Sequence, residues 1–176
     1  MKKVFTFLAA VCLIACTGND PDLNYIDLGL TSGNLWKNTN EINPIDSSEY
    51  FSGDQIDAEL PQYSDYRLYP TSYDWEELWT ECEWTWTGAG YTIVGPNGNT
   101  ITLPALGMRD EDGTIIRKDS VCEYWERSGY YSGRWRWFDD KRICVSNMYS
   151  TYGAPIRRVK RAEDYRNSDG STSRER

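Results

Sequence analysis

The sequence contains no histidine, and this absence excludes several kinds of active site at once. Without an imidazole there is no Ser-His-Asp or Cys-His hydrolase, no histidine general base and no HExxH zinc site. Phenylalanine is also scarce, with four residues against eight Trp and 13 Tyr. Trp and Tyr join an apolar ring to a polar atom, so they suit positions at the edge of a core. We expect a protein that is not an enzyme and that places rings both inside and on its surface.

The N-terminal apolar run is too short to cross a bilayer as a helix. It covers twelve residues, Val4 to Ala15, which is the usual length of the hydrophobic part of a signal peptide. A Lys-Lys pair precedes the run, and Leu13-Ile14-Ala15-Cys16 ends it in a pattern that resembles the lipobox of bacterial lipoproteins. We predict that residues 1–15 are a lipoprotein signal peptide and that Cys16 carries the lipid that anchors the protein to a membrane. The alternative is an ordinary signal peptide with an incidental cysteine.

Positive charge is the scarcer sign in this chain. Lys and Arg number 19 against 27 Asp and Glu, a formal net charge of −8. This balance opposes binding to nucleic acid and adsorption to anionic lipid by charge. The C-terminal end differs, with seven basic and four acidic residues from Arg157 onward. We predict a tether over residues 16–24, one domain over 25–160 and a disordered basic tail over 161–176.

Cysteine is scarce as well, with five residues in the chain. Cys12 leaves with the signal peptide and Cys16 carries lipid, which leaves Cys82, Cys122 and Cys144. In an oxidising compartment these three allow one disulfide, for which we take Cys122 with Cys144, and the alternative is three buried thiols. A zinc site has neither a CxxC spacing nor a histidine to support it. We expect no metal and no cofactor.

The clearest periodic pattern is a short amphipathic helix over residues 72–82. Thr71 is a good N-cap residue, and Asp74 follows three positions later, as in a capping box. The apolar residues recur at i, i+3, i+4 and i+7 and therefore share one helical face: Trp75, Leu78, Trp79 and Cys82. We expect this face to pack against a sheet.

Alternation of apolar and polar residues predicts strands before and after this helix. Strands are expected over 25–30, 35–36, 83–87, 91–94, 100–103, 121–127, 133–138 and 142–147. Gly-Pro-Asn-Gly at 95–98 and Asp-Glu-Asp-Gly at 110–113 are typical of turns. Residues 37–66 are polar and contain two prolines, so we expect a long irregular loop there.

Six short segments follow one another between residues 25 and 160. They are Tyr25-Ile26-Asp27-Leu28-Gly29-Leu30-x-Ser32-Gly33-x-Leu35-Trp36, Pro70-Thr71-x-x-Asp74-Trp75-x-Glu77-Leu78, Cys82-Glu83-Trp84-Thr85-Trp86, Gly98-Asn99-x-Ile101-x-Leu103-Pro104-Ala105-x-Gly107, Tyr124-Trp125 and Gly153-x-x-Ile156-Arg157-x-Val159. In content and order they resemble the Fibrobacter succinogenes major paralogous domain family.

This resemblance implies an α+β domain similar to the C-type-lectin-like fold. Such a domain packs a short helix on a twisted antiparallel sheet with long loops, and its first and last strands pair to close the fold. The family is common in lipoproteins of Bacteroidetes, which agrees with the lipobox. It implies no general biochemical activity.

Residues 130–137 interleave arginine with aromatic residues in the order Tyr-Tyr-Ser-Gly-Arg-Trp-Arg-Trp. In a strand the two Trp would share one face, which we expect to be core, and the two Arg would share the opposite, solvent-facing one. Tyr, Trp and Arg are enriched among the residues that dominate binding energies. The candidate ligand-binding residues are therefore Tyr130, Tyr131, Arg134, Arg136, Tyr149 and Tyr152. The alternative is a core strand whose arginines are merely solvated.

Two classes of function remain open. The first is a lipid-anchored binding module of the cell envelope, with a glycan or a surface protein as ligand; a special case is a binding protein diversified by a retroelement near its C-terminal end. The second is a structural or assembly component, such as an adhesin or a fimbria-like accessory. Either would lie at the outer membrane, on the cell surface or on the periplasmic face. Asp119-Ser120-Val121 resembles the O-glycosylation pattern of Bacteroidetes, which makes Ser120 a candidate modification site, with an unmodified turn as the alternative.

Overall fold

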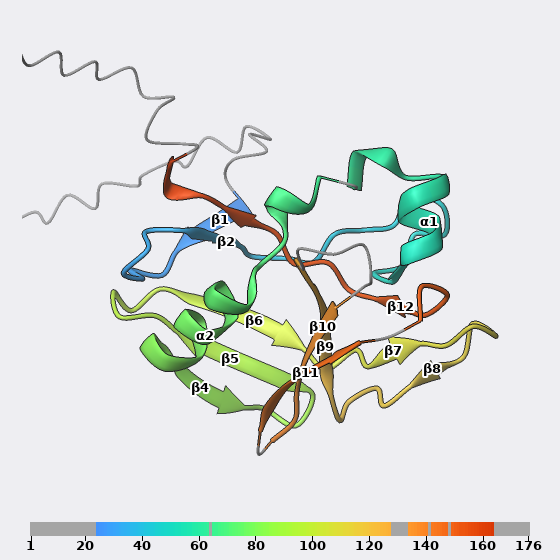
Figure 1. The fold of residues 1–176 in the computed structure, drawn as a ribbon. Helices are drawn as coiled ribbons and strands as arrows, with labels where there is room; N and C mark the ends of the chain where they lie inside the picture. Colours follow the sequence, from blue (N-terminus) through green and yellow to red (C-terminus); the bar gives the residue numbers. More distant parts are fainter. Residues whose placement is uncertain (1–23, 64, 128–133, 141, 148, 164–176) are drawn as a thin grey trace, which may run out of the picture.

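The structure, a computed structural model, describes residues 24–63, 65–127, 134–140, 142–147 and 149–163 (Figure 1). The predicted signal peptide, Cys16, Tyr130 and Tyr131 lie outside the described residues. In chain order the elements are β1 (Tyr25–Asp27), β2 (Leu35–Lys37), β3 (Phe51–Ser52), α1 (Gly53–Ala58), two 3-10 helices (Pro61–Tyr63 and Tyr66–Leu68), α2 (Ser72–Glu81), β4 (Glu83–Trp86), β5 (Gly90–Val94), β6 (Thr100–Pro104), β7 (Met108–Arg109), β8 (Ile115–Ile116), β9 (Cys122–Glu126), β10 (Arg134–Phe138), β11 (Ile143–Asn147), β12 (Gly153–Ala154) and β13 (Val159–Lys160). None of the described helices is long and apolar enough to span a membrane.

Antiparallel strand pairs dominate the structure, which confirms the α+β class. Within the described residues the strands form four small sheets, in the orders β1-β2-β13, β11-β10-β9, β3-β12-β7-β8 and β4-β5-β6. The predicted strands are present, with ends shifted by only a few residues. Figure 1 shows α2 beside β4, β5 and β6, whereas α1 lies at the other end of the molecule.

The predicted helix over 72–82 is confirmed as α2, and its start has the expected capping box. The Thr71 side chain accepts a hydrogen bond from the Asp74 backbone N–H at 3.2 Å, while the Asp74 carboxylate accepts from the Thr71 N–H at 2.6 Å. These bonds satisfy backbone donors that the first turn of a helix leaves unpaired. Trp75 and Leu78 are fully buried, so the apolar face of α2 packs inward as its spacing predicts.

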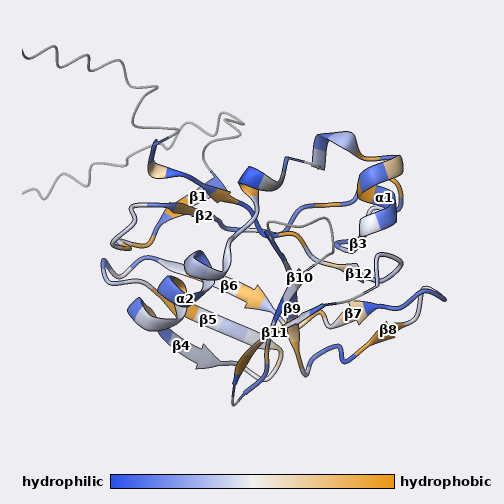
Figure 2. Ribbon diagram, in the orientation of Figure 1, coloured by the Kyte–Doolittle hydropathy of each residue, from blue (hydrophilic) through white to orange (hydrophobic). Residues whose placement is uncertain are grey.

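The sheet of β9, β10 and β11 separates two hydrophobic cores. Cys122, Tyr124 and Phe138 point into the first core, which also contains the apolar face of α2. Trp125 and Trp135 point to the opposite side, into the second core with Phe51 and Ile56, among others. Because both faces are covered, every residue of β9 is buried, including two glutamates. Figure 2 shows the hydrophobic residues on the sheets, notably on β6 and β8, and polar residues along the loops and most of α1.

The prediction of an irregular loop over residues 37–66 is wrong in part. This segment contains β3 and the six-residue helix α1. The Ser52 side chain caps α1, and Gln55 completes a second capping box. Only Ile56 is buried within the helix, so no apolar period reveals it in the sequence.

The expected pairing of the first and last strands is also wrong. β2 lies between β1 and β13, so Ile26 and Val159 both pair with Trp36 rather than with each other. Trp36 is fully buried and belongs to the first core, with Ile26 and Val159 as its cross-strand neighbours on the two sides.

The disulfide expected between Cys122 and Cys144 is not formed, and both are free thiols. Cys122 lies in β9 and Cys144 in β11, with β10 between them; their partners on β10 are Phe138 and Trp137. Two strand spacings amount to about 10 Å, well beyond the Cα separation that a disulfide allows.

The folded domain extends past the predicted boundary at residue 160. Arg161 binds the Asp74 carboxylate and donates a hydrogen bond to the Tyr69 carbonyl at 3.0 Å. Ala162 is buried, and its N–H donates to the Asn34 side chain at 3.0 Å. Residues 161–163 therefore belong to the domain rather than to a tail.

Candidate functional site

Tyr149 and Tyr152, two of the predicted ligand-binding residues, form a ring pair on the turn that leads into β12. Their ring centroids lie 6.1 Å apart with planes inclined by 31°. Tyr149 is 78% exposed, while Tyr152 packs against the second core. The inner ring therefore supports the outer one, which offers an accessible aromatic surface.

Backbone contacts fix this turn in place. The Tyr152 N–H donates to the Tyr149 carbonyl at 3.1 Å, and the Asp54 N–H donates to the Ser150 carbonyl at 3.2 Å. Gly53 permits the second contact, because a Cβ there would lie 3.3 Å from Ser150. The turn is thus held against the start of α1, and the exposed ring of Tyr149 is presented by a rigid backbone.

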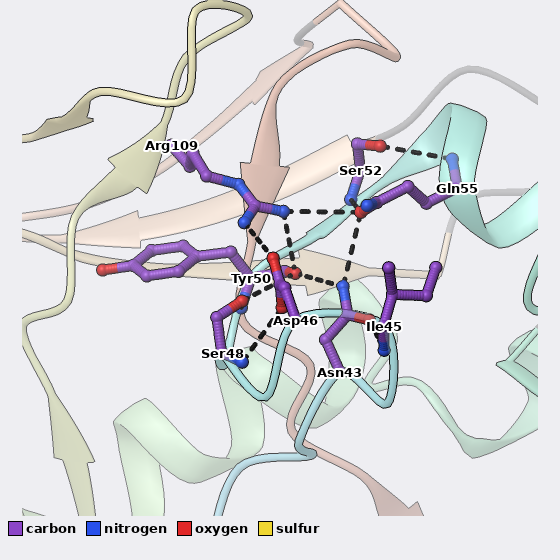
Figure 3. Close-up of polar contacts among 8 residues, drawn as sticks. All are labelled: Asn43, Ile45, Asp46, Ser48, Tyr50, Ser52, Gln55 and Arg109. Atoms are coloured by element: carbon purple, nitrogen blue, oxygen red, sulfur yellow. Dashed lines mark hydrogen bonds and ion pairs between the residues drawn. The ribbon is translucent and has the colours of Figure 1, made fainter.

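A second loop, residues 43–48, lies beside the start of α1, where the Asn43 side chain bonds Gln55 (Figure 3). The side chain of Asn43 is fully buried; it donates to the Tyr50 carbonyl at 2.8 Å and accepts from the Ile45 N–H at 3.0 Å. The backbone of Ser47 has a φ of 59° and donates to the Asn43 carbonyl at 2.8 Å. This buried asparagine keeps Ile45 in a fixed position at 49% exposure.

Arg109 of β7 joins that loop to the sheet. Its guanidinium binds the Asp46 carboxylate, donates to the Tyr50 carbonyl at 3.3 Å and lies 5.8 Å from the centroid of the Tyr50 ring. Burial alone would raise the pKa of Asp46, but hydrogen bonds from Ser48 and Arg109 bring it below its ordinary value. Arg109 is also the β7 partner of Gly153, directly after Tyr152.

The structure separates the predicted arginine row from the tyrosine pair. Arg136 is not a free contact residue: it binds Glu126 at 2.7 Å, and its side chain is only 13% exposed. Arg136 points to the face of β10 opposite Trp135, whereas Tyr152 packs on the Trp135 side. The prediction that Arg136 faces solvent is therefore wrong, because a buried carboxylate holds it on the side of the sheet away from Tyr152.

The remaining predicted residues lie as follows. Arg134 begins β10 and pairs with Glu126 and Asn147 in the backbone ladder. Trp135 is buried as expected, but Trp137 is half-buried and lies outside both core clusters. Ser120 is exposed in the turn before β9, where a modification would be accessible.

The sequence analysis missed Asn43, Asp46 and Arg109. The contact between Asp46 and Arg109 spans 63 residues, so local spacing gives no indication of it. The one available signal is turn chemistry: Asn-Pro and Asp-Ser favour side-chain-capped turns.

The groups at this end of the molecule are of three kinds. They are an exposed ring, hydrogen-bonding side chains that already have partners, and an ion pair. In the described part of the chain, no cluster of three or more potential ligand side chains could hold a metal ion.

Comparison with known families, curated proteins and solved structures finds no match for this chain. The likeness to the Fibrobacter succinogenes family therefore stays a prediction that depends on the six segments.

Proposed function

We propose that this chain is a lipid-anchored binding module of the bacterial cell envelope that binds a glycan on the exposed ring of Tyr149. Its domain would be of the Fibrobacter succinogenes major paralogous type with a C-type-lectin-like fold. Cys16 would attach it to the outer membrane, and the domain would act on the cell surface or the periplasmic face. The signal-peptide pattern and the order of the six segments support these parts of the proposal.

The observation that carries the ligand proposal is the tyrosine pair. An exposed aromatic ring on a fixed backbone offers amphipathic contact area at low conformational cost. Tyr152 supports the Tyr149 ring from below, and Ser150 holds the turn against α1. The apolar face of a sugar ring stacks on such a platform, whereas a flexible polar loop would lose more entropy on binding.

A glycan array probed with the full-length chain in detergent tests this proposal. The Tyr149→Ala variant should lose the glycans that the wild type retains, with an unchanged melting temperature because the ring is exposed. Tyr73→Ala is the matched control, since Tyr73 is 81% exposed on α2, far from the turn in sequence. Equal retention of the same glycans by wild type and Tyr149→Ala would contradict the proposal.

A second candidate function, a structural or assembly lipoprotein, is favoured by the loop around Asn43. Ile42 and Ile45 are 54% and 49% exposed on a loop whose conformation a buried side chain fixes. Rigid, exposed aliphatic side chains suit contact with another protein more than contact with a sugar. An Ile42→Ser/Ile45→Ser variant that keeps the wild-type glycan profile but no longer joins a protein complex of the envelope would favour this second function.

A further inference from the structure

Trp137, near the C-terminal end of β10, is half-buried and marks a surface of the β9–β10–β11 sheet distinct from the turn that carries Tyr149. Trp137 pairs with Glu123 on β9 and with Cys144 on β11, so the three side chains share one face. On the same face, Trp125 and Trp135 are covered by the second core, whereas Trp137 is only partly covered. Of the three tryptophans on this face, Trp137 is therefore the one whose ring reaches the surface.

One arginine lies over this ring, and a second binds the carboxylate of the ring's cross-strand neighbour. The Arg142 guanidinium lies 5.0 Å from the centroid of the Trp137 ring and pairs with the Asp139 carboxylate at 3.2 Å, and its side chain is 66% exposed. Arg117 binds the carboxylate of Glu123, the cross-strand neighbour of Trp137, and is 42% exposed. Both arginine side chains are therefore partly exposed, one against the Trp137 ring and the other against the residue paired with it across the strands.

The backbone of Arg117 forms a turn, and its guanidinium contacts two side chains. Arg117 has a φ of 58°, and its carbonyl accepts the N–H groups of Ser120 and Val121 at 3.2 and 3.1 Å. Its Nη2 atom contacts both Glu123 and the sulfur of Met108. Within the described residues its Nε and Nη1 atoms have no protein partner.

The carboxylate of Glu123, which binds Arg117, has only one of its two oxygen atoms paired among the described residues. Its side chain is 1% exposed, and its Oε2 atom is buried without a hydrogen-bond partner among the described residues. Burial raises the pKa of Glu123 to about 7, although Arg117 opposes the shift. The other titratable groups that interact with Glu123 are Tyr50 and, on the opposite face of β9, Cys122.

We propose that Arg117, Trp137 and Arg142 form a binding site for an acidic sugar, with Glu123 as the group that makes binding depend on pH. The sugar ring contacts the indole, and its carboxylate pairs with the guanidinium of Arg117, which suits bidentate carboxylate binding. While Glu123 is ionised it occupies Arg117 and repels the incoming carboxylate. Once Glu123 is protonated, Arg117 is released to the ligand.

The expected pH dependence follows from the titration of one group. With a pKa of about 7, Glu123 is protonated in about nine tenths of molecules at pH 6 and about one tenth at pH 8. If only the protonated form binds, the apparent Kd for an acidic sugar is about tenfold lower at pH 6 than at pH 8. The ligand carboxylate stays ionised at both pH values.

Calorimetric titration of the full-length chain in detergent with digalacturonate tests the site. The wild type should bind about tenfold more tightly at pH 6 than at pH 8. The methyl ester of the same disaccharide keeps the ring but not the charge, so it should bind more weakly and with no pH dependence. Absence of digalacturonate binding at pH 6, or equal affinity at the two pH values, would overturn the proposal.

Variants then assign the roles. Glu123→Gln should bind at pH 8 as tightly as the wild type binds at pH 6, and Arg117→Gln should lose binding at both. Arg117→Lys, which keeps the charge without the planar fork, should bind more weakly than the wild type. Arg67→Gln is the matched control, because Arg67 is also an exposed arginine paired with a carboxylate. A Glu123→Gln variant that keeps the tenfold pH dependence would overturn the role of Glu123.

This site is separate from the one proposed for Tyr149. Tyr149→Ala should leave digalacturonate binding unchanged, and Arg117→Gln should leave the neutral glycan profile unchanged. The indole N–H resonance of Trp137 gives a further readout: it should shift on addition of digalacturonate in the wild type and stay in place in a folded Arg117→Gln variant.

Discussion

The carboxylate of Asp74 at the start of α2 binds the guanidinium of Arg161, 87 residues further along the chain. The same carboxylate accepts a hydrogen bond from the Asn34 side chain at 3.0 Å and from Thr71 at 2.6 Å. Only 5% of Asp74 is exposed. One buried side chain therefore joins the segment after β1, the helix start and the residues after β13.

Replacing Asp74 by Asn should destabilise the domain by about 3 kcal/mol at pH 7, because it leaves Arg161 without its ionic partner. Burial tends to raise the pKa of Asp74, but hydrogen bonds from Arg161 and Thr71 lower it overall. The stabilisation is therefore present above the ordinary pKa of an aspartate and is lost as the pH falls through the lower, folded-state value. Urea denaturation across that range measures it. Glu76→Gln, an exposed change on the same helix, is the control, and equal midpoints for the two variants would contradict the prediction.

Glu123 should have the opposite effect on stability. Its pKa is raised from 4.5 to about 7, so between these values the folded state binds more protons than the unfolded chain. The contribution of this group to stability therefore falls as the pH rises from 4.5 to 7. Relative to Glu123→Gln, the wild type should lose roughly 3 kcal/mol between pH 4.5 and pH 8. Parallel urea curves for the two proteins at both pH values measure this difference, and a constant difference would refute it.

Alanine substitutions of the two tryptophans of β10 should differ sharply in how much they destabilise the domain. Trp135 is fully buried in the second core against the Trp125 ring, so Trp135→Ala should cost roughly 3–5 kcal/mol. Trp137 lies outside both core clusters, so Trp137→Ala should cost about 1 kcal/mol. Thermal melts of the two variants, followed by far-UV circular dichroism, provide the comparison. Similar losses would mean that Trp137 is a core residue.

Three thiols should be titratable in the mature chain without any reductant. Cys82, Cys122 and Cys144 are all free. Cys122 is fully buried, and burial raises its pKa to about 12, so it should react with iodoacetamide only after unfolding. Cys144 is half-buried and should react in the native state. Mass spectrometry of native and denatured samples counts the alkylated cysteines, and fewer than three in the denatured chain would reveal a disulfide.

Cys16 should carry the lipid anchor. A Cys16→Ala variant should accumulate as the unprocessed precursor and leave the detergent phase on phase separation. Cys144→Ala should be processed and partition like the wild type. If the Cys16 variant still partitions with the detergent, the lipoprotein prediction is wrong.

Local patterns predicted local structure well. Thr71 and Asp74 predicted the start of α2, since a capping box depends only on residues three apart. Period-two alternation predicted β4, β5, β6, β10 and β11 to within a residue or two, because the strands are exposed to different surroundings on their two faces. In contrast, α1 buries one residue, Ile56, and so leaves no periodic signal in the sequence.

Contacts between segments that are distant in the sequence could not be predicted from local patterns. Alternation places Arg136 on the face of β10 opposite Trp135. It cannot show that the buried carboxylate of Glu126 lies on that same face and binds Arg136. Likewise, it places Cys122 and Cys144 on strands without giving the order β11-β10-β9 that keeps them apart. The candidate surface at Tyr149 and Tyr152 was predicted from composition, whereas its neighbours Asn43 and Arg109 depend on contacts between distant segments.

The order of the strands in the terminal sheet has a mechanical consequence. β1 and β13 are both antiparallel to β2, so they run parallel to each other on its two sides. Tension between Tyr25 and Lys160 would pull these strands in opposite directions along β2. Because the hydrogen bonds between antiparallel strands are perpendicular to the strands, such a force loads them together in shear instead of opening them one after another. A domain tethered at its N-terminal side and pulled from its C-terminal side would thus meet its strongest resistance at the strand that carries Trp36.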